Sequence, residues 1–157
     1  MYFMYVTYVM CYYISKGGMA MLSTLNATDV RKNWGQFNDD VIRVGPRFVK
    51  RSRDEWAALS SEQLKAAFES FRFKAEFSRE EDNSITMTLE GFDLAENAET
   101  KEEVIDLMAD SLADYAEDYM AQFTLYSNSP NRKKHFPYLM NVMAQSDTEA
   151  VKALIDA

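Results

Sequence analysis

The chain has 157 residues, of which 47% are hydrophobic, and its 25 acidic and 17 basic residues give a net charge of −8. This length is enough for one ordinary domain or two small ones with a buried core. The single cysteine, Cys11, and the single histidine, His135, exclude a disulfide framework, a cysteine-based zinc site and a histidine-rich metal site. We expect His135 to be a partly exposed aromatic residue near a helix start.

Residues 1–20 differ from the rest of the chain, since Met1–Ile14 carries no charge. That stretch is shorter than the ~20 apolar residues of a membrane helix. It also lacks the positive charges that precede the apolar part of a secretory signal. Residues 16–19, Lys-Gly-Gly-Met, can be encoded by a bacterial ribosome-binding sequence placed shortly before a start codon at Met21. We therefore interpret residues 1–20 as an untranslated leader, or else a disordered tail, and expect a cytoplasmic protein without a membrane partner.

Residues 21–69 predict a small βαβα module. A short extended piece, Leu22–Leu25, leads to Asn26, which is a good helix N-cap with Asp29 as its capping-box partner. The helix that follows ends at Gly45 and the adjacent proline. One apolar stripe runs along this helix, formed by Val30, Trp34, Phe37 and Val41.

The second half of this module is predicted as a strand and a helix. Arg47–Arg51 reads as a short strand, after which Ser52 and Glu55 open a helix carrying Trp56 and Leu59. That helix restarts at Ser60 or Ser61, and Leu64 and Phe68 continue its buried side. A module of about 50 residues buries only a modest share of its surface. We therefore expect a homodimer in which two modules share a sheet.

Residues 70–157 predict a β-hairpin backed by a long helix. The segments Phe71–Phe77 and Ile85–Leu89 alternate apolar and polar residues around a turn at Glu81–Ser84. Thr100 then forms a capping box with Glu103 and opens a helix that runs to about Leu125. The expected core stripe of this helix consists of Val104, Leu107, Met108, Leu112, Tyr115, Tyr119 and Phe123.

Two shorter helices are expected at the C-terminal end, one near Phe136–Ala144 and one capped by Ser146–Glu149. The predicted fold class is therefore α+β, with a small dimerising βαβα module followed by a hairpin and long-helix module with C-terminal helices.

Charge is divided between the two halves. Residues 26–53 hold seven basic and three acidic residues, whereas residues 54–125 hold nineteen acidic and five basic ones. The net charges of +4 and −14 favour two partners of opposite sign. Nucleic acid is the commonest partner of a compact basic block, and the alternative is an ordinary solvated surface.

The basic block contains candidate nucleic-acid contacts. The helix start at residues 26–29 offers backbone N–H groups that suit phosphate, and arginine can pair with guanine edges. The alternative is that several cations flank an exposed edge strand and prevent its aggregation. The predicted DNA-binding residues are Thr28, Arg31, Lys32, Asn33, Arg47, Lys50, Arg51 and Arg53.

The long helix repeats an aspartate every four residues, at Asp106, Asp110, Asp114 and Asp118. This row is a solvated face or a docking face for a basic partner. A divalent metal needs oxygens that converge from several elements, so we expect neither metal nor cofactor. The predicted partner-binding residues are Asp106, Asp110 and Asp114 with Phe136, Tyr138, Leu139 and Met143, the last four in a C-terminal segment expected to lie in a groove of the partner.

Residues 23–59 resemble the N-terminal module of Phd/YefM-type antitoxins. Thr28, Arg31 and Asn33 match the helix start of that family, and Arg51 matches the strand end. The sequence Asp54-Glu55-Trp56-x-x-Leu59 matches its closing helix. The family usually has a further strand between the arginine and the closing helix. Here the predicted closing helix follows Arg51 so directly that we expect this strand to be missing.

The second half, with its hairpin and "AETKEEVIDLMADSLADYAEDY", resembles the partial RNase H-like fold of HicB-type antitoxins. Together the two resemblances imply a non-enzymatic antitoxin, homodimeric, that represses its own operon by binding operator DNA and neutralises a basic, RNA-cleaving toxin. The chain has no Gly-rich phosphate loop, GxSxG or HExxH motif, in agreement with this hypothesis. The alternatives are a DNA-binding regulator with a sensing domain and no toxin, and an enzyme with a metal on the acidic helix.

Overall fold

The computed structural model describes residues 24–157, so the interpretation of residues 1–20 lies outside the described part of the chain. The protein is mixed α+β, with two small sheets and several helices. It divides into two compact units at Ser60 and Ser61, which we describe separately as the first unit (residues 24–60 of the described chain) and the second unit (residues 61–157).

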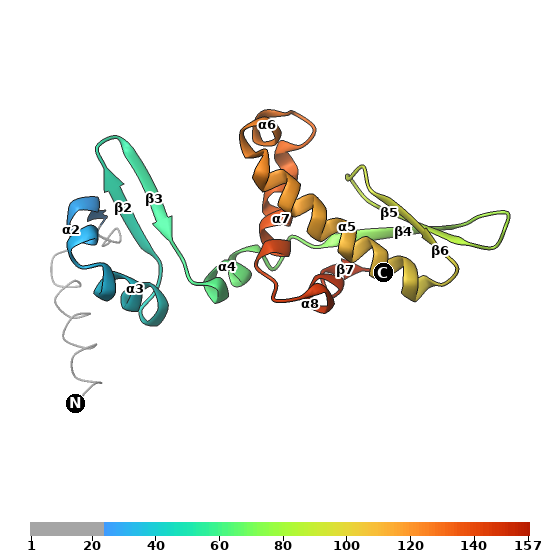
Figure 1. Cartoon of the computed structure of the whole chain (residues 1–157), viewed down its shortest axis with the longest axis horizontal. Coiled ribbons are helices and arrows are strands. Elements are labelled where there is room, and N and C mark those ends of the chain that lie inside the picture. The colour runs from blue at the N-terminus through green and yellow to red at the C-terminus, as the bar shows by residue number, and fades with distance from the viewer. Residues whose placement is uncertain (1–23) are drawn as a thin grey trace, which may run out of the picture. The chain divides into compact units, whose positions relative to one another are not determined.

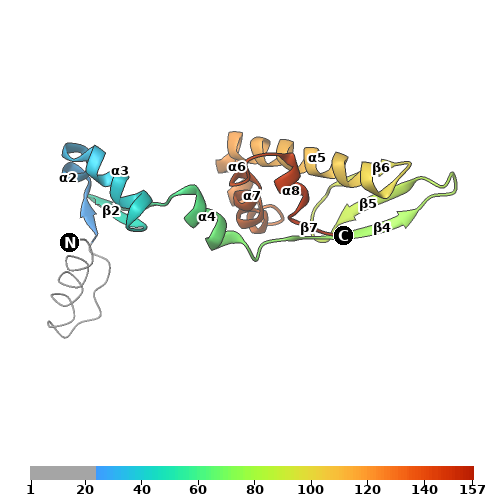
Figure 2. The same ribbon diagram turned by 90° about the horizontal axis from the view of Figure 1, so that it is seen from below.

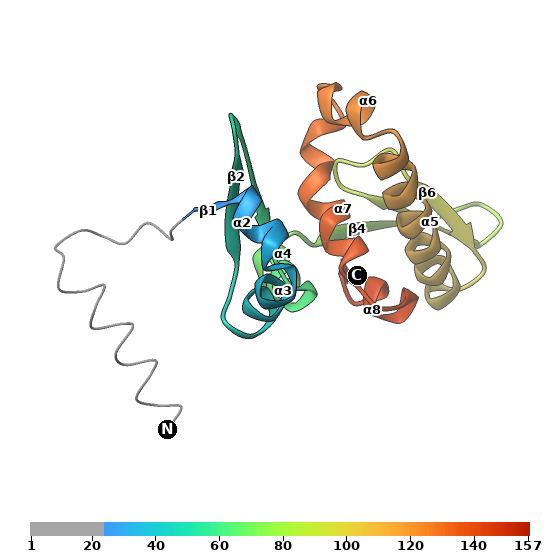
Figure 3. The same cartoon turned by 60° about the vertical axis from the view of Figure 1, so that its left-hand side comes forward.

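The first unit places two short helices on one side of a three-stranded sheet (Figure 3). The sheet has the order β1-β2-β3, with β1 parallel and β3 antiparallel to the central strand. Val49 at its centre faces Leu25 on one side and Trp56 on the other. The elements are β1 (Leu25–Asn26), α2 (Ala27–Lys32), α3 (Trp34–Arg43), β2 (Arg47–Arg51) and β3 (Asp54–Ala58).

The helix predicted as continuous after Asn26 is interrupted at Asn33. The N-cap is confirmed, because the Thr28 N–H donates to Asn26 Oδ1 at 2.8 Å. At Asn33, however, the side-chain Nδ2 donates to the Asp29 carbonyl at 3.1 Å, and the backbone leaves helical geometry. Asparagine side chains compete in this way with the helix's own hydrogen bonds. The predicted apolar stripe is wrong at Trp34, which is 57% exposed, while its other three members are buried.

The predicted helix after Ser52 is wrong, because Asp54–Ala58 is the edge strand β3. Ser52 adopts a left-handed conformation, with φ of 55°, and turns the chain back along β2. The pairing extends from Arg51 opposite Asp54 to Arg47 opposite Ala58. The backbone hydrogen bonds of a hairpin override the weak helical signal of so short a segment. The further strand that we expected to be missing is therefore present as β3.

The second unit consists of a four-stranded sheet, of order β6-β5-β4-β7, covered by helices. The long helix α5 lies along the sheet, and α7 and α8 pack beside it (Figures 1 and 2). The elements are α4 (Ser61–Phe68), β4 (Phe73–Arg79), β5 (Ile85–Leu89), β6 (Ala95–Ala98), α5 (Lys101–Ala121), α6 (Phe123–Asn128), the 3-10 helix η1 (Lys133–His135), α7 (Phe136–Met143), α8 (Thr148–Lys152) and β7 (Ile155–Asp156).

The predicted hairpin is confirmed, since β4 pairs antiparallel with β5 across a turn that contains Asn83 at a positive φ. The capping box of α5 is also confirmed. The Glu103 N–H donates to Thr100 Oγ1 at 3.2 Å, and the Thr100 N–H donates to Glu103 Oε2 at 3.1 Å. The remaining strands were not predicted, because β6 is poor in β-branched and aromatic residues and β7 has only two residues.

The core of the second unit lies between α5, the sheet and the C-terminal helices. Two predicted core members of α5 are wrong, because Leu107 and Phe123 are exposed. Phe123 leaves the stripe because the helix breaks at Gln122 and resumes as α6. The fully buried side chains include Phe73, Met87, Val104, Met108, Leu112, Tyr119 and Leu139.

Helix α4 belongs to the second unit, although the sequence grouped it with the N-terminal module. It packs against α7. The Phe68 ring contacts Phe71, and Phe71 in turn packs edge-on against Tyr138 at 5.2 Å. Asn141, buried in α7, fixes the same connection by donating from Nδ2 to the Phe71 carbonyl at 3.0 Å.

Candidate functional site

The predicted DNA-binding residues all lie in the first unit, on α2, on β2 and in the turn after it. Thr28, Arg31 and Lys32 are exposed on α2, and Asn33 is exposed at its end. The Thr28 N–H is not free for a phosphate, because the Asn26 side chain already accepts from it. The helix start therefore offers fewer free donors than the sequence indicated.

Two of the predicted cations are held by acidic neighbours. Arg47 lies 3.5 Å from the Asp40 carboxylate of α3, and its side chain is largely buried. Lys50 lies 3.2 Å from Glu55 on the paired strand. The correction of residues 54–58 from helix to strand explains the second pair, because the hairpin register sets Lys50 opposite Glu55.

Four cations remain exposed, and within the described residues they make no ion pair or side-chain hydrogen bond. They are Arg31, Lys32, Arg51 and Arg53. Alternation along β2 puts Arg51 on the sheet face of buried Val49, which is the face covered by α2 and α3. These four residues, called here the open cations, can neutralise phosphates without first breaking an internal ion pair.

The first unit also leaves much of its apolar surface uncovered. Only four side chains form its buried core: Val30, Phe37, Val41 and Val49. The Phe37 ring extends this core outward, stacking on Trp34 at 5.5 Å and meeting Trp56 edge-on at 6.1 Å. The exposed large apolar residues of the unit are Trp34, Ile42, Val44, Phe48, Trp56 and Leu59. Within the described residues, these apolar side chains are candidates for contact with another chain.

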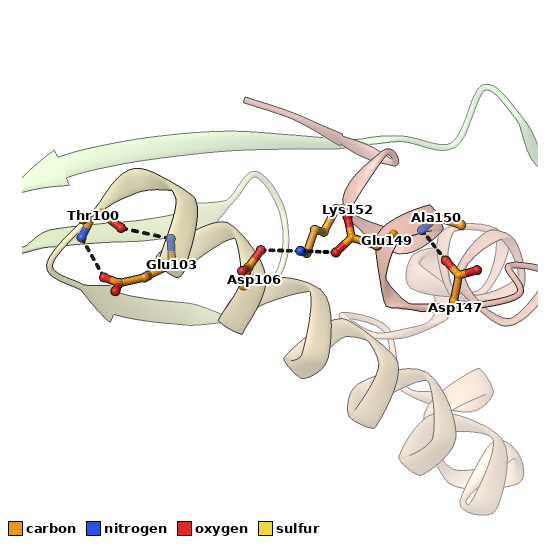
Figure 4. A network of polar contacts seen from close by, with 7 residues as sticks. All are labelled: Thr100, Glu103, Asp106, Asp147, Glu149, Ala150 and Lys152. Carbon is orange, nitrogen blue, oxygen red and sulfur yellow. Dashed lines mark hydrogen bonds and ion pairs between the residues drawn. The ribbon is translucent and has the colours of Figure 1, made fainter.

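The aspartate row of α5 is exposed as predicted, but its first member is already paired. Lys152 of α8 lies 2.5 Å from Asp106 and 2.5 Å from Glu149 (Figure 4). These hydrogen bonds, that to Asp106 first, raise the pKa of Lys152 to about 12. The Asp147 side chain caps the same α8 by accepting from the Ala150 N–H at 2.8 Å (Figure 4). Asp106 thus ties α8 to α5.

Asp110, Asp114 and Asp118 are exposed on α5, and within the described residues none of them has an ion-pair partner. At 3.6 residues per turn, Leu107 lies on the same side of the helix, and 43% of it is exposed. This side of the helix therefore presents an apolar side chain followed by a row of three carboxylates, and we call it the acidic face (Leu107, Asp110, Asp114 and Asp118).

The C-terminal segment does not form the projecting tail that the sequence suggested. Leu139 is 0% exposed, and Phe136 and Tyr138 pack against the same core. Of the four predicted contact residues in this segment, only Met143 is open to a partner, at 47% exposed. An apolar stripe has the same sequence pattern whether it packs inside its own unit or against another chain.

His135 is buried, at 3% exposed, contrary to the expectation of a partly exposed residue. Its Nε2 lies 2.9 Å from the Gly91 carbonyl, its Nδ1 lies 2.8 Å from the Tyr115 hydroxyl, and Phe92 packs on the ring at 4.3 Å. Because a carbonyl only accepts, Nε2 carries the proton and Nδ1 accepts from Tyr115. Burial lowers the pKa of His135, so the ring is neutral. No sequence motif indicated this network.

No cluster of three or more metal-ligating side chains occurs among residues 24–157. In the same part of the chain, no helix combines the length and the apolar character needed to cross a bilayer.

Comparison with known proteins gives one matching family and one similar solved structure. The family model for PHD-like proteins, described as "Antitoxin of toxin-antitoxin, RelE / RelB, TA system", matches residues 21–157. A crystal structure of "an antitoxin part of a putative toxin/antitoxin system" from Syntrophomonas wolfei subsp. wolfei is 41% identical to this chain, with a TM-score of 0.80. That similarity covers 85% of this chain and 96% of the other. No curated protein matches the chain.

Proposed function

The chain belongs to the PHD-like family of antitoxins of toxin–antitoxin systems, and on that premise we propose that it neutralises a basic toxin and represses its own operon. The family membership implies a cognate toxin as partner. Our proposal goes further in four respects: the toxin is basic, it cleaves RNA, operator DNA is a second partner, and the chain forms a homodimer.

The first unit is the proposed operator-binding module. Its open cations, Arg31, Lys32, Arg51 and Arg53, supply positive charge that no internal partner neutralises within the described residues. Thr28 and Asn33, exposed beside them on α2, supply hydrogen-bonding groups. Arg47 and Lys50 play a smaller role in the proposal, because Asp40 and Glu55 already hold them.

A homodimer through the first unit is supported by its uncovered apolar residues. The unit exposes six large apolar side chains and buries four. A symmetric pairing buries the same apolar side chains on both copies at once. It would also present two sets of open cations, which suits an operator with two half-sites.

The acidic face of α5 is the proposed toxin-binding surface. Asp110, Asp114 and Asp118 are the open carboxylates, and Leu107, at the N-terminal end of this row, is the apolar side chain that a partner can bury. Charges at such an interface mainly speed association, whereas a buried apolar anchor sets the lifetime of the complex. Met143 remains a candidate contact, while Asp106, Phe136, Tyr138 and Leu139 serve the antitoxin's own fold.

We retain the two-module architecture as a proposal. The first unit's short strand, helices and hairpin fit a Phd/YefM-like module, now with the further strand that family usually has. The antiparallel strands β4, β5 and β6 followed by α5 fit a HicB-like module.

The observation that carries the proposal is an acidic face on which, within residues 24–157, no aspartate has an ion-pair partner, in a chain that belongs to an antitoxin family. It is tested in cells that express the product of the neighbouring reading frame as toxin. The double variant Asp110→Asn/Asp114→Asn should rescue growth less well than the wild type. In binding assays on the purified proteins, the variant should also bind the toxin more weakly than the wild type, with the larger difference at low salt.

Glu76→Gln/Glu81→Gln is the matched control, because it removes the same charge from exposed positions on the β4–β5 hairpin. If both double variants lost rescue equally, the loss would come from the changed net charge of the chain, and a toxin site on α5 would be contradicted. Promoter repression without any neighbouring toxin gene would favour the alternative, a DNA-binding regulator.

A further inference from the structure

A cavity of about 300 Å³ lies in the second unit, where the start of β4 and the residues that follow β5 meet η1 and α7. This volume is at the lower end of the range for small-molecule sites. The cavity belongs to neither surface used above, since it contains no residue of the first unit or of the acidic face. Its lining residues are Arg72, Lys74, Glu90, Gly91, Phe92, Lys134, His135 and Tyr138.

The cavity is positive although it lies in an acidic unit. The second unit as a whole carries nine basic and twenty acidic residues. The cavity lining reverses this balance, with the cations of Arg72, Lys74 and Lys134 against the single carboxylate of Glu90. A lone carboxylate among three cations cannot hold a divalent metal, whereas the arrangement suits an anion.

The three cations are not equally available. Arg72 donates to Asp156 and to the Ala153 carbonyl, and Lys74 lies 3.4 Å from Glu90. Lys134 is exposed and has no ion-pair partner within the described residues. Its ammonium lies 3.9 Å from the point where a Cβ on Gly91 would be. Gly91 has a φ of +80°, which favours glycine, and this turn brings the backbone next to Lys134.

Aromatic rings form the apolar part of the lining. Phe92 packs on His135 at 4.3 Å and meets Tyr138 edge-on at 5.4 Å. His135 is neutral, and both its nitrogens are engaged, by Gly91 and Tyr115. It therefore supplies a rigid ring surface rather than a charge or a catalytic base.

We propose that this cavity binds a nucleoside phosphate, with its phosphate on Lys134 and its base against the rings of Phe92 and Tyr138. A lysine ammonium beside a phosphate forms strong charge-assisted hydrogen bonds, and every base offers a flat face to aromatic side chains. The nucleoside phosphate is either a free mononucleotide or an unpaired nucleotide of a single-stranded nucleic acid. The site is independent of toxin binding by α5 and of operator binding by the first unit.

The test is calorimetric titration of the purified full-length chain at low salt. The probes are AMP, UMP, adenosine, inorganic phosphate and a short single-stranded oligonucleotide. At least one mononucleotide, or the oligonucleotide, should bind more tightly than both adenosine and phosphate, because only these probes use the rings and Lys134 together. Lys134→Gln should weaken that binding at least about tenfold.

Lys133→Gln is the matched control, because Lys133 is the exposed neighbour on the same η1 turn and does not line the cavity. It should change the affinity by less than about twofold, with both variants unfolding at the temperature of the wild type. Lys134-dependent binding of the oligonucleotide alone assigns the site to a nucleic-acid strand, and binding of mononucleotides assigns it to the free compound. Equal weakening by both variants, or no probe that binds better than adenosine and phosphate, would overturn the proposal.

Discussion

The two units of this chain solve the problem of burying apolar surface in opposite ways. The second unit buries fourteen hydrophobic residues in one cluster, drawn from its sheet and from α5, α7 and α8. The first unit buries four hydrophobic residues, and the rings of Trp34 and Trp56, which pack on Phe37, are partly exposed. Among the described residues, the second unit thus has a much larger buried core than the first, and this difference is what leads us to propose a second copy as the partner of the first unit.

The largest effect that this comparison implies is the loss of a core side chain in the second unit. Leu139→Ala should destabilise that unit by ~2–5 kcal/mol, because it leaves a cavity in a fully packed site. Met143→Ala, one turn further along the same helix α7 and exposed, should change the free energy of unfolding by less than ~0.5 kcal/mol. Urea denaturation of both variants measures the difference. A similar, small effect at both positions would mean that the C-terminal segment projects toward a partner after all.

The next effect concerns the exposed apolar residues of the first unit, which we propose to lie in the dimer contact. Ile42→Glu/Val44→Glu should weaken the homodimer by at least ~2 kcal/mol, because it places charges where apolar contact is expected. Sedimentation of the variant across a concentration series would measure this as dissociation to monomers. Leu125→Glu introduces the same residue at an exposed apolar position of the second unit and should leave the dimer intact. A wild-type chain that is monomeric at every concentration would remove the need for a partner copy.

A smaller effect is expected for operator binding. Arg31→Ala and Arg51→Ala should each weaken binding to the chain's own promoter by ~1–3 kcal/mol if they contact bases, with a weaker effect on unrelated DNA. Affinity should also fall with rising salt, because phosphate binding releases counterions. Arg43→Ala, on α3 and beside Asp39, removes the same charge from the first unit and serves as control. Unchanged promoter binding in the Arg31/Arg51 double variant would exclude these open cations from the DNA interface.

The smallest effect is a pH dependence that only the second unit can show, because it holds the single histidine. Burial lowers the pKa of His135 below its ordinary value of 6.5, which it regains on unfolding. Arg132 and Lys134 nearby lower it further, while the Gly91 carbonyl and Asp93 act in the opposite direction. The unfolded chain therefore binds more protons, so stability is complete above about pH 6.5 and declines as the pH falls toward the folded pKa.

The slope of that decline is at most ~1.4 kcal/mol per pH unit, the limit for one proton. Urea unfolding at several pH values between about 5 and 8 should show it in the wild type. His135→Gln should lack the decline, because a glutamine does not titrate and can still reach Gly91 and Tyr115. An identical pH profile in both proteins would contradict the burial of a neutral histidine.

Local signals in the sequence predicted much of the second unit. Residues only a few positions apart determine three of its features: the capping box of Thr100 and Glu103, the alternation of β4 and β5, and the N-cap at Asp147. β7 could not be found in this way, because two residues become a strand only by pairing with β4 from the far end of the unit.

The candidate surfaces were harder to predict because charge alone does not show which side chains are already paired. Lys50 is paired with Glu55 because residues 54–58 form a strand beside it. Asp106 is paired with Lys152, which lies 46 positions further along the chain. The left-handed Ser52 that creates β3 has no glycine or asparagine signal in the sequence. The open cations and the acidic face could therefore be defined only from the fold.

The most direct test of the antitoxin assignment is to identify the proteins that co-purify with the chain from its native host. The tagged chain, purified at moderate salt and analysed by mass spectrometry, should carry a small basic protein encoded next to it in a stoichiometric complex. The Asp110→Asn/Asp114→Asn variant should retain less of that protein, while Glu76→Gln/Glu81→Gln should retain as much as the wild type. A chain that purifies without such a protein, from a host in which both neighbouring genes are expressed, would contradict the account.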